Sequence, residues 1–420
     1  MNLKHTALSL SFLLLAACSA SSTDGDGDAA RGPIAKADNL GSCETTCDGK
    51  APGGTCYCDA TCMQYGDCCS DRAMFCGGGG TVTGDAGVPA FGTDDSRSFV
   101  VIADRQAGLA TPRDLEFNPA DPTQLWTVNR KTDAVVIVKK VGTAEQTFDV
   151  RDDAFGNHFM EEVAAFAFGD NDAFASIHES RNTYDNVGFP NDFMGPALWP
   201  ANLSILARVN QNPNGELLGS HLDMLHQSPL SMGIAHHAGN AYWVFDGMYG
   251  HIVYYDFQKD HGPGYHDHSD GIVRRYLEVE VQRVPDIPSH LVNDKATGWL
   301  YIADTGNQRV LRMDTSSGSV TRQFQPRNEP LAEFTGVTGV TVEVFASQNL
   351  VAPSGIEVHG TTLFVSDFGT GEIIAYDTTS GAELGRLATG ARGIMGLAVG
   401  PDEKLYFVDG RDDLLVRIDP

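Results

Sequence analysis

This chain of 420 residues has almost no cysteine outside one short stretch, because eight of its nine cysteines lie within residues 43–76 and the ninth is Cys18. Residues 77–420 therefore offer no thiol nucleophile. Basic residues are also scarce, with 29 Lys and Arg against 55 Asp and Glu and a net charge of −26. Such a surface argues against a nucleic-acid partner and against binding to anionic membrane surfaces. The sequence also lacks a Gly-x-Ser-x-Gly nucleophile elbow and a phosphate-binding loop.

Long apolar runs are missing as well, apart from Leu8 to Ala17, which is too short to span a bilayer comfortably. This run follows the polar Lys4 and His5 and ends in small residues, as an export signal does. We therefore predict a cleaved signal peptide over residues 1–17 and an exported protein. The polar, acidic residues 18–40 have no apolar periodicity and are predicted to be a flexible tether.

The end of this signal, Leu15-Ala16-Ala17-Cys18, resembles the bacterial lipobox. The resemblance implies cleavage before Cys18, acylation of its thiol, and a lipid as the link to the membrane. Ser19 follows where a retention signal has Asp, which favours the outer membrane, with the protein facing either the periplasm or the outside. The alternative is an ordinary signal peptide that happens to be followed by a cysteine.

Residues 41–77 form a module that is too small and too rich in cysteine to depend on an apolar core. Export places it in an oxidising compartment, so disulfides are expected rather than a zinc site. Spacing alone allows 105 pairings of eight cysteines, although two adjacent cysteines cannot easily bond each other. The cysteines expected to be paired are Cys43, Cys47, Cys56, Cys58, Cys62, Cys68, Cys69 and Cys76.

The module resembles a somatomedin B domain through Cys56-x-Cys58-Asp59, Cys62 and the run from Tyr65 to Asp71, which contains the adjacent Cys68 and Cys69. The resemblance implies a protein-interaction knob, and the alternative is a stapled spacer without a partner. A Gly-rich linker follows over residues 78–96.

From residue 97 onward no helical periodicity persists, and one unit of short strands recurs. Its second strand ends in a polar residue six times, at Asn129, His178, Asp246, Asp304, Asp367 and Asp409. The unit resembles the NHL repeat, and six copies imply an all-β, six-bladed β-propeller over residues 97–420. The last copy lacks an outer strand, and the strand Ser98 to Ala103 is predicted to supply it and close the ring.

The six polar strand ends are expected to ring one face of the propeller, termed the top. An acidic ring attracts cations, but an Asp at a strand end more commonly caps its own turn. The top mouth of the channel is also predicted to gather metal-ligand residues under a lid formed by the long insertion Ser180 to Asn202. The candidate ligands there are His178, His226, His251, His290, Asp246 and Asp304.

A second histidine group is expected on the opposite, bottom face, around the connection that runs from His261 to Asp270. Its candidates are His236, His237, His261, His266 and His268. His-x-His with nearby carboxylates suits zinc or copper, whereas carboxylates alone prefer calcium. The alternative is a polar loop whose histidines form local hydrogen bonds. Because the two groups are placed on opposite faces, they are not expected to share a site.

Six-bladed NHL propellers include amidating lyases, which hold zinc on histidines at the starts of three inner strands. The corresponding positions here carry Met232, Ser289 and Ser354, which argues against that activity. Propeller lactonases, which place one calcium ion in the channel, offer a second and less specific analogy.

Together these features predict an exported, lipid-anchored binding or interaction protein of the cell envelope, with a protein or carbohydrate ligand and with either one divalent metal, Zn, Cu or Ca, or no cofactor. The alternative is a metal-dependent lyase or lactonase-type hydrolase that works at the top mouth.

Overall fold

The computed structural model describes residues 41–65, 67–69, 71–76, 82–83, 88–93, 96–182, 192–265 and 267–420. Cys18, the predicted signal peptide and the predicted tether lie outside these residues. In the described part of the chain, no helix has the length and apolar character needed to cross a membrane.

The cysteine module contains two short helices, α1 (Cys62–Tyr65) and α2 (Arg72–Cys76), and is cross-linked by four disulfides. The disulfides are Cys43–Cys58, Cys47–Cys76, Cys56–Cys69 and Cys62–Cys68. The adjacent Cys68 and Cys69 have different partners, as their spacing predicts. The buried centre of the module consists mainly of sulfur atoms and Ala51, so the cross-links replace the apolar core that so short a segment lacks.

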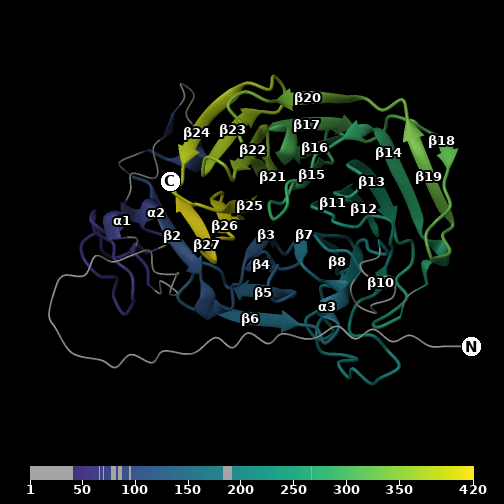
Figure 1. Cartoon of the computed structure of the whole chain (residues 1–420), viewed down its shortest axis with the longest axis horizontal. Coiled ribbons are helices and arrows are strands. Elements are labelled where there is room, and N and C mark those ends of the chain that lie inside the picture. The colour runs from purple at the N-terminus through teal and green to yellow at the C-terminus, as the bar shows by residue number, and fades with distance from the viewer. Residues whose placement is uncertain are drawn as a thin grey trace, which may run out of the picture. The chain divides into compact units, whose positions relative to one another are not determined.

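The described residues of the propeller form six blades of mainly antiparallel strands around a central channel, which confirms the predicted propeller (Figure 1). The innermost strands are β3 (Pro112–Phe117), β7 (Val163–Phe168), β11 (Gly233–Ala238), β15 (Leu291–Asp294), β21 (Pro353–His359) and β25 (Ile394–Val399). We number the blades one to six in the order of these strands.

The second strand of each blade is almost entirely buried, because the sheets of both neighbouring blades cover it. These strands are β4 (Gln124–Asn129), β8 (Ala173–His178), β12 (Ala241–Asp246), β16 (Trp299–Asp304), β22 (Thr362–Asp367) and β26 (Leu405–Asp409). In β8 and β12 every residue is buried. Burial on both faces explains why these segments read as continuous apolar runs rather than as alternating ones. All six end at the polar residue that the repeat predicts.

The outer strands complete the blades. They are β5 (Ala134–Lys139) and β6 (Thr147–Asp152) in blade one, β9 (Ala197–Pro200) and β10 (Asp223–Met224) in blade two, β13 (His251–Asp256) and β14 (Ile272–Glu280) in blade three, β17 (Arg309–Asp314) and β20 (Val342–Ala346) in blade four, β23 (Glu372–Asp377) and β24 (Glu383–Ala388) in blade five, and β27 (Leu414–Asp419) with β2 (Ser98–Ala103) in blade six. The short β1 (Val82–Thr83) pairs with β24. The remaining helical turns are α3 (Gly156–Phe159), η1 (Pro89–Phe91), η2 (Arg105–Ala107), η3 (His268–Asp270) and η4 (Thr305–Asn307).

Strand β2 pairs with β27 in antiparallel register, from Ser98 opposite Asp419 to Ala103 opposite Leu415. The strand that closes the ring therefore comes from the N-terminal side, as predicted. This pairing removes two free sheet edges from the propeller.

Blade three is larger than the repeat predicts. A hairpin of β18 (Ser319–Gln323) and β19 (Glu333–Thr338), located in sequence between two strands of blade four, joins the outside of blade three. Strand β19 pairs with β14 in parallel, with Ile272 opposite Glu333. The blade thus has six strands, and its outer half contains residues far apart in sequence.

The insertion predicted to be a lid, Ser180 to Asn202, is partly a strand. Its residues 197–200 form β9, the third strand of blade two, and Met194 and Trp199 are fully buried in the core. Residues 183–191, including Phe189, lie outside the described residues. Trp199 therefore belongs to the blade core, whereas the Phe193 ring stacks on the ring of His226 at 3.5 Å.

Candidate functional site

The polar residues at the strand ends cap turns, which is the structural alternative noted above. Asp367 Oδ1 accepts hydrogen bonds from the backbone of Gly369, Thr370 and Ala352. Asp409 Oδ1 accepts from Arg411 and Asp412 in the same way. Each carboxylate thereby satisfies backbone donors of the turn that follows its strand.

Asp246 and Asp304, which are also predicted metal ligands, use their oxygens similarly. Asp246 Oδ1 accepts from Met248 and Tyr249, and Arg275 lies 2.6 Å from Oδ2. Asp304 accepts from the backbone of Gln282 and pairs with Arg309 at 2.7 Å. Both carboxylates are completely buried, so these partners offset the cost of burying their charge.

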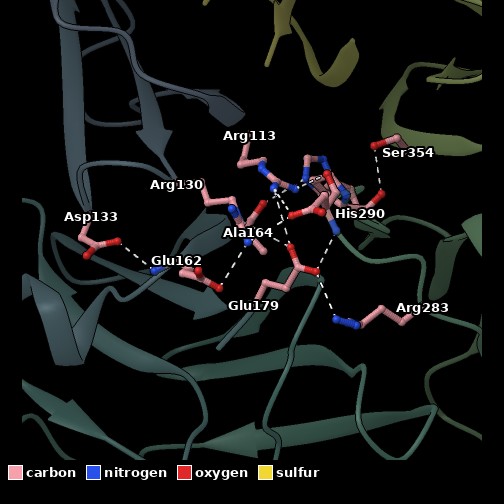
Figure 2. A network of polar contacts seen from close by, with 11 residues as sticks. Arg113, Arg130, Asp133, Glu162, Ala164, Glu179, Arg283, His290 and Ser354 are labelled. Atoms are coloured by element: carbon pink, nitrogen blue, oxygen red, sulfur yellow. Dashed lines mark hydrogen bonds and ion pairs between the residues drawn. The ribbon is translucent and has the colours of Figure 1, made fainter. Parts of the chain in front are cut away.

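The top of the channel is filled by an ion network centred on Glu179, which directly follows β8 (Figure 2). Arg113 Nη2 and Arg130 Nε each lie 3.6 Å from Glu179 Oε2, and Arg283 Nη2 lies 3.3 Å from Oε1. The backbone of Asp286 donates to Oε1 at 2.8 Å, and the Arg113 guanidinium donates to the Asp286 carbonyl. Three blades thus contribute charges to one compact cluster.

Burial dominates the electrostatics of this network. The side chains of Arg113 and Glu179 are only 1% and 2% exposed. Burial lowers the pKa of Arg113 to about 10, although Glu179 opposes the shift. Burial likewise raises the pKa of Glu179, and the surrounding arginines act against this. The guanidinium groups and the Glu179 carboxylate thus compensate one another's charge, although Glu179 Oε2 accepts no hydrogen bond from the described residues.

Beneath this network lies a cavity of about 170 Å³, lined by residues of all six inner strands. His290 is 4% exposed, and its Nδ1 lies 3.4 Å from Asp114 Oδ1. Two further carboxylates, those of Glu116 and Glu357, line the cavity. The channel is therefore small and mainly acidic.

These channel carboxylates join neighbouring blades. Asp114 Oδ2 and Glu116 Oε2 accept hydrogen bonds from the backbone of Phe166 and Phe168 on the next inner strand. Burial raises the pKa of Glu116 well above its ordinary range, and the charge of Asp114 adds to this. We interpret the carboxylates as acceptors for inner-strand amides that have no partner strand.

Glu357 provides a pH test of this arrangement. Burial raises its pKa from 4.5 to about 8, and the nearby Asp114 charge adds to the shift. A raised folded-state pKa stabilises the fold fully below pH 4.5, and this contribution is lost as the pH rises through about 8. We expect Glu357→Gln to gain stability relative to the parent between pH 5 and 9. The gain should be on the order of 2 kcal/mol, because solvent partly reaches this side chain. Urea unfolding of both proteins at pH 5 and pH 9 measures their difference in free energy of unfolding. An equal difference at the two pH values would contradict the expectation.

The residues predicted to converge at the top mouth are separated. Among the described residues, no metal-like cluster of three ligands contains His178, His251 or His290. His178 is buried at the end of β8, where Nδ1 donates to the Gly195 carbonyl, and burial lowers its pKa to about 3. His251 lies at the start of β13 and lines a separate surface pocket.

The amidating-lyase ligand positions are structural here. Met232 is fully buried in the core, the hydroxyls of Ser289 and Thr305 lie 2.6 Å apart, and Ser354 donates to the Pro288 carbonyl. The sequence argument against this lyase therefore agrees with the contacts of these residues.

The expectation that the two histidine groups lie apart on opposite faces is wrong. His226 of the predicted top group and His268 of the predicted bottom group both place Nδ1 at 2.9 Å from Glu329 Oε2. Burial alone would raise the pKa of Glu329, but hydrogen bonds from the two histidines prevail and hold it at about 2. The hairpin that carries β18 and β19 brings Glu329 to this point, which explains why local sequence did not reveal it.

A second cluster lies in the same region and contains Asp223, His261 and Asp270. His261 Nε2 is 3.3 Å from Asp270 Oδ1 and 3.8 Å from Asp223 Oδ2. Burial raises the pKa of Asp223 to about 8, and the charges of Asp270 and Glu329 add to the shift. Two carboxylates and an imidazole thus face one another, with Asp223 buried and His261 and Asp270 partly exposed.

The other predicted bottom ligands point elsewhere. His236 donates through Nε2 to the Gly239 carbonyl, and its Nδ1 lies 2.8 Å from the Lys295 amine. His237 accepts a hydrogen bond from the Trp243 indole. His266 lies outside the described residues.

A surface pocket of about 380 Å³ on blade three contrasts with the acidic chain around it. Its lining residues include Arg275, Arg322, Arg327, Tyr249, Phe324 and Phe334. We name it the arginine pocket. Arg275 lies over the Tyr249 ring at 4.9 Å, and Arg322 lies over the Phe324 ring at 5.7 Å. Arg275 and Arg327 have carboxylate partners in Asp246 and Asp192, whereas no ion pair to Arg322 occurs in the described part of the chain.

Sequence reasoning missed the arginines of this pocket and of the top network, because the first set spans 52 residues (327 − 275) and the second 170 (283 − 113), with no common motif. Asp270 closes the histidine-rich segment and was a visible signal. Asp223 and Glu329 had no such signal in their local sequence, since each reaches its cluster through long-range packing.

Comparison with known proteins identifies the cysteine module. A family model of the somatomedin B domain matches residues 41–79. Residues 41–79 are a somatomedin B domain. This domain and its four disulfides indicate a secreted, extracellular protein. Among curated protein sequences, none matches the chain significantly.

Several solved structures resemble this chain at low sequence identity. A streptogramin B lyase is 10% identical with a TM-score of 0.47, and the match covers 77% of this chain and 98% of that one. An auxiliary nutrient binding protein from Bacteroides thetaiotaomicron is 12% identical with a TM-score of 0.48, covering 74% and 69%. A luciferin-regenerating enzyme is 13% identical with a TM-score of 0.45, covering 77% and 96%. Likenesses this low carry no functional information.

Proposed function

We propose that this protein is an exported binding protein whose propeller binds an anionic saccharide in the arginine pocket. The size and lining of this pocket carry the proposal. Its volume of about 380 Å³ lies within the range of small-ligand sites, whereas the channel cavity of about 170 Å³ falls below it. The top mouth, where the alternative enzyme would work, is occupied by the network around Glu179.

The chemistry of the lining favours a carboxylate or sulfate on a ring. A guanidinium presents a planar fork of donors that matches such anions, and Arg322 has no competing ion pair among the described residues. Phe324, Phe334 and the half-exposed Tyr249 offer apolar surface for a sugar ring. A concave pocket of this volume suits one or two sugar units as its ligand better than it suits the flat surface of a protein partner.

The remaining parts of the chain would position this pocket outside the cell. We propose that Cys18 carries a lipid that anchors the protein in a bacterial outer membrane, supported by the lipobox-like sequence before it. The somatomedin B domain exposes Tyr65 by 63%, and an exposed aromatic ring suits a protein contact. The domain would then serve as a second, protein-binding element.

The arginine pocket predicts a charge-dependent affinity. We expect oligogalacturonate to bind the full chain, and its fully methyl-esterified form to bind weakly or not at all, in isothermal titration calorimetry. Arg322→Glu should weaken binding by about 10- to 100-fold, the value of one charged hydrogen-bonding group.

The matched control is Arg411→Glu. Arg411 also lies over an aromatic ring, that of Phe368 at 4.5 Å, but it belongs to the turn before β27 rather than to the pocket. The Arg411→Glu substitution should leave the affinity for oligogalacturonate unchanged. Equal binding of the esterified ligand, or equal losses in both variants, would contradict the proposal.

A further inference from the structure

The cluster of Asp223, His261 and Asp270 combines groups from two distant segments. Asp223 begins β10 at the outer edge of blade two, whereas His261 and Asp270 lie in the connection between β13 and β14 of blade three. One ligand atom from each residue lies within 4.8 Å of the other two. This spacing allows a single cation to contact all three.

Two oxygens in this cluster lack the partners that burial demands. The Asp223 side chain has no exposed surface, and its Oδ1 accepts a hydrogen bond from the backbone of Met224. Its Oδ2 is buried and has no hydrogen-bond partner among the described residues, and the same holds for Asp270 Oδ2. Burying carboxylate oxygens without donors costs several kcal/mol unless a charge or a metal ion compensates.

The adjacent cluster around Glu329 differs in this respect. Glu329 receives hydrogen bonds from His226 and His268 and, on its other oxygen, from Gln227 at 2.7 Å. Its carboxylate is thus fully satisfied by protein donors. The same region therefore contains one cluster whose carboxylate is satisfied and one with two unpartnered buried oxygens among the described residues.

We propose that Asp223, His261 and Asp270 hold one divalent transition-metal ion, either zinc or manganese. Two carboxylates with one imidazole suit these ions, whereas calcium prefers oxygen ligands alone and copper(I) prefers sulfur. Three protein ligands leave a coordination position for water. This inference is independent of the arginine pocket, because none of the three ligands lines it.

The ion would join two blades. It links the edge strand of blade two to the connection whose turn η3 is already fixed by the contact between His268 and Glu329. Because the ion would bind the folded chain and not the unfolded one, it should raise the melting temperature in proportion to the logarithm of its free concentration.

The test uses the full chain, purified without a histidine tag, stripped with a chelator and dialysed against Zn²⁺ or Mn²⁺. We expect one ion per chain by plasma mass spectrometry and a higher melting temperature. Asp223→Asn and Asp270→Asn should each lower the affinity at least 100-fold. Both keep the side-chain shape, so the variants are expected to fold.

Asp267→Asn is the matched control, since it lies in the same connection and is exposed. Asp267 accepts a hydrogen bond from the backbone of Ser269, which the Asn oxygen preserves. The Asp267→Asn variant should bind the ion with the affinity of the parent protein. Co²⁺ provides a second readout, because a visible absorption band should appear in the parent and be lost in His261→Gln.

Three results would overturn the proposal. The first is that the chain holds no Zn²⁺ or Mn²⁺ at 50 µM free ion, which is about five times a Kd of 10 µM for the proposed site. The second is that Asp223→Asn binds the ion as tightly as the parent. The third is that Glu329→Gln loses the ion while Asp223→Asn retains it. The last result would assign the ion to the His226 and His268 cluster instead.

Discussion

Replacing Glu179 with alanine is expected to destabilise the propeller by about 3–5 kcal/mol, the usual cost of removing one partner of a buried ion pair. The loss would leave Arg113, which is 1% exposed, without the nearest compensating charge, and would also remove contacts to Arg130 and Arg283. Urea unfolding followed by tryptophan fluorescence measures the effect. All four tryptophans lie in the propeller, at positions 126, 199, 243 and 299.

Glu162→Ala is the control for this prediction. Glu162 pairs with the same Arg130 at 3.2 Å, but its side chain is 46% exposed. An exposed ion pair contributes about 0–1 kcal/mol, so this variant should remain close to the parent. Equal effects of the two substitutions would show that burial of the Glu179 network does not stabilise the ring.

Removing the Cys47–Cys76 disulfide by double substitution to serine is expected to destabilise the somatomedin B domain by about 3–4 kcal/mol. The two cysteines are separated by 29 residues, the longest span of the four disulfides. Because Cys47 is exposed, the change removes little packing and acts mainly on the unfolded chain. Limited trypsin digestion, with mass spectrometry of cleavage at Lys50 and Arg72, measures the opening of the domain.

The comparison is with Cys62 and Cys68, which are separated by only six residues. Loop entropy gives this disulfide about 2–2.5 kcal/mol, so its removal should accelerate cleavage less. Tryptophan fluorescence should remain unchanged in both variants, since the somatomedin B domain has no tryptophan. Faster cleavage in the Cys62 and Cys68 variant would contradict the loop-length argument.

The blades could be predicted from sequence because the three inner strands of each form a local unit. Its second strand is an apolar run that ends in a polar capping residue, as at Asp367, and the whole signal lies within about 25 residues. The closing strand was also visible, because the last repeat lacks an outer strand and a spare apolar strand precedes the first.

The candidate site was predicted only in part, because its contacts depend on pairing between distant segments. His226 and Glu329 lie 103 residues apart and meet through the hairpin that extends blade three. Nothing in the sequence of β18 or β19 specifies a parallel partner, since strand composition records burial and not the identity of the neighbour. His261 was recognised as a candidate because its connection is rich in histidine, but its partner Asp223 was not.

Ring closure by β2 has a consequence for synthesis on the ribosome. Its partner residues in β27 are translated about 320 residues later, which takes roughly 15 to 60 s at usual elongation rates. During this time the apolar strand Ser98–Ala103 has no native partner, and the emerging blades form an open arc with a free edge at each end. Until the last blade is made, β2 is therefore an unpaired apolar strand that is open to aggregation.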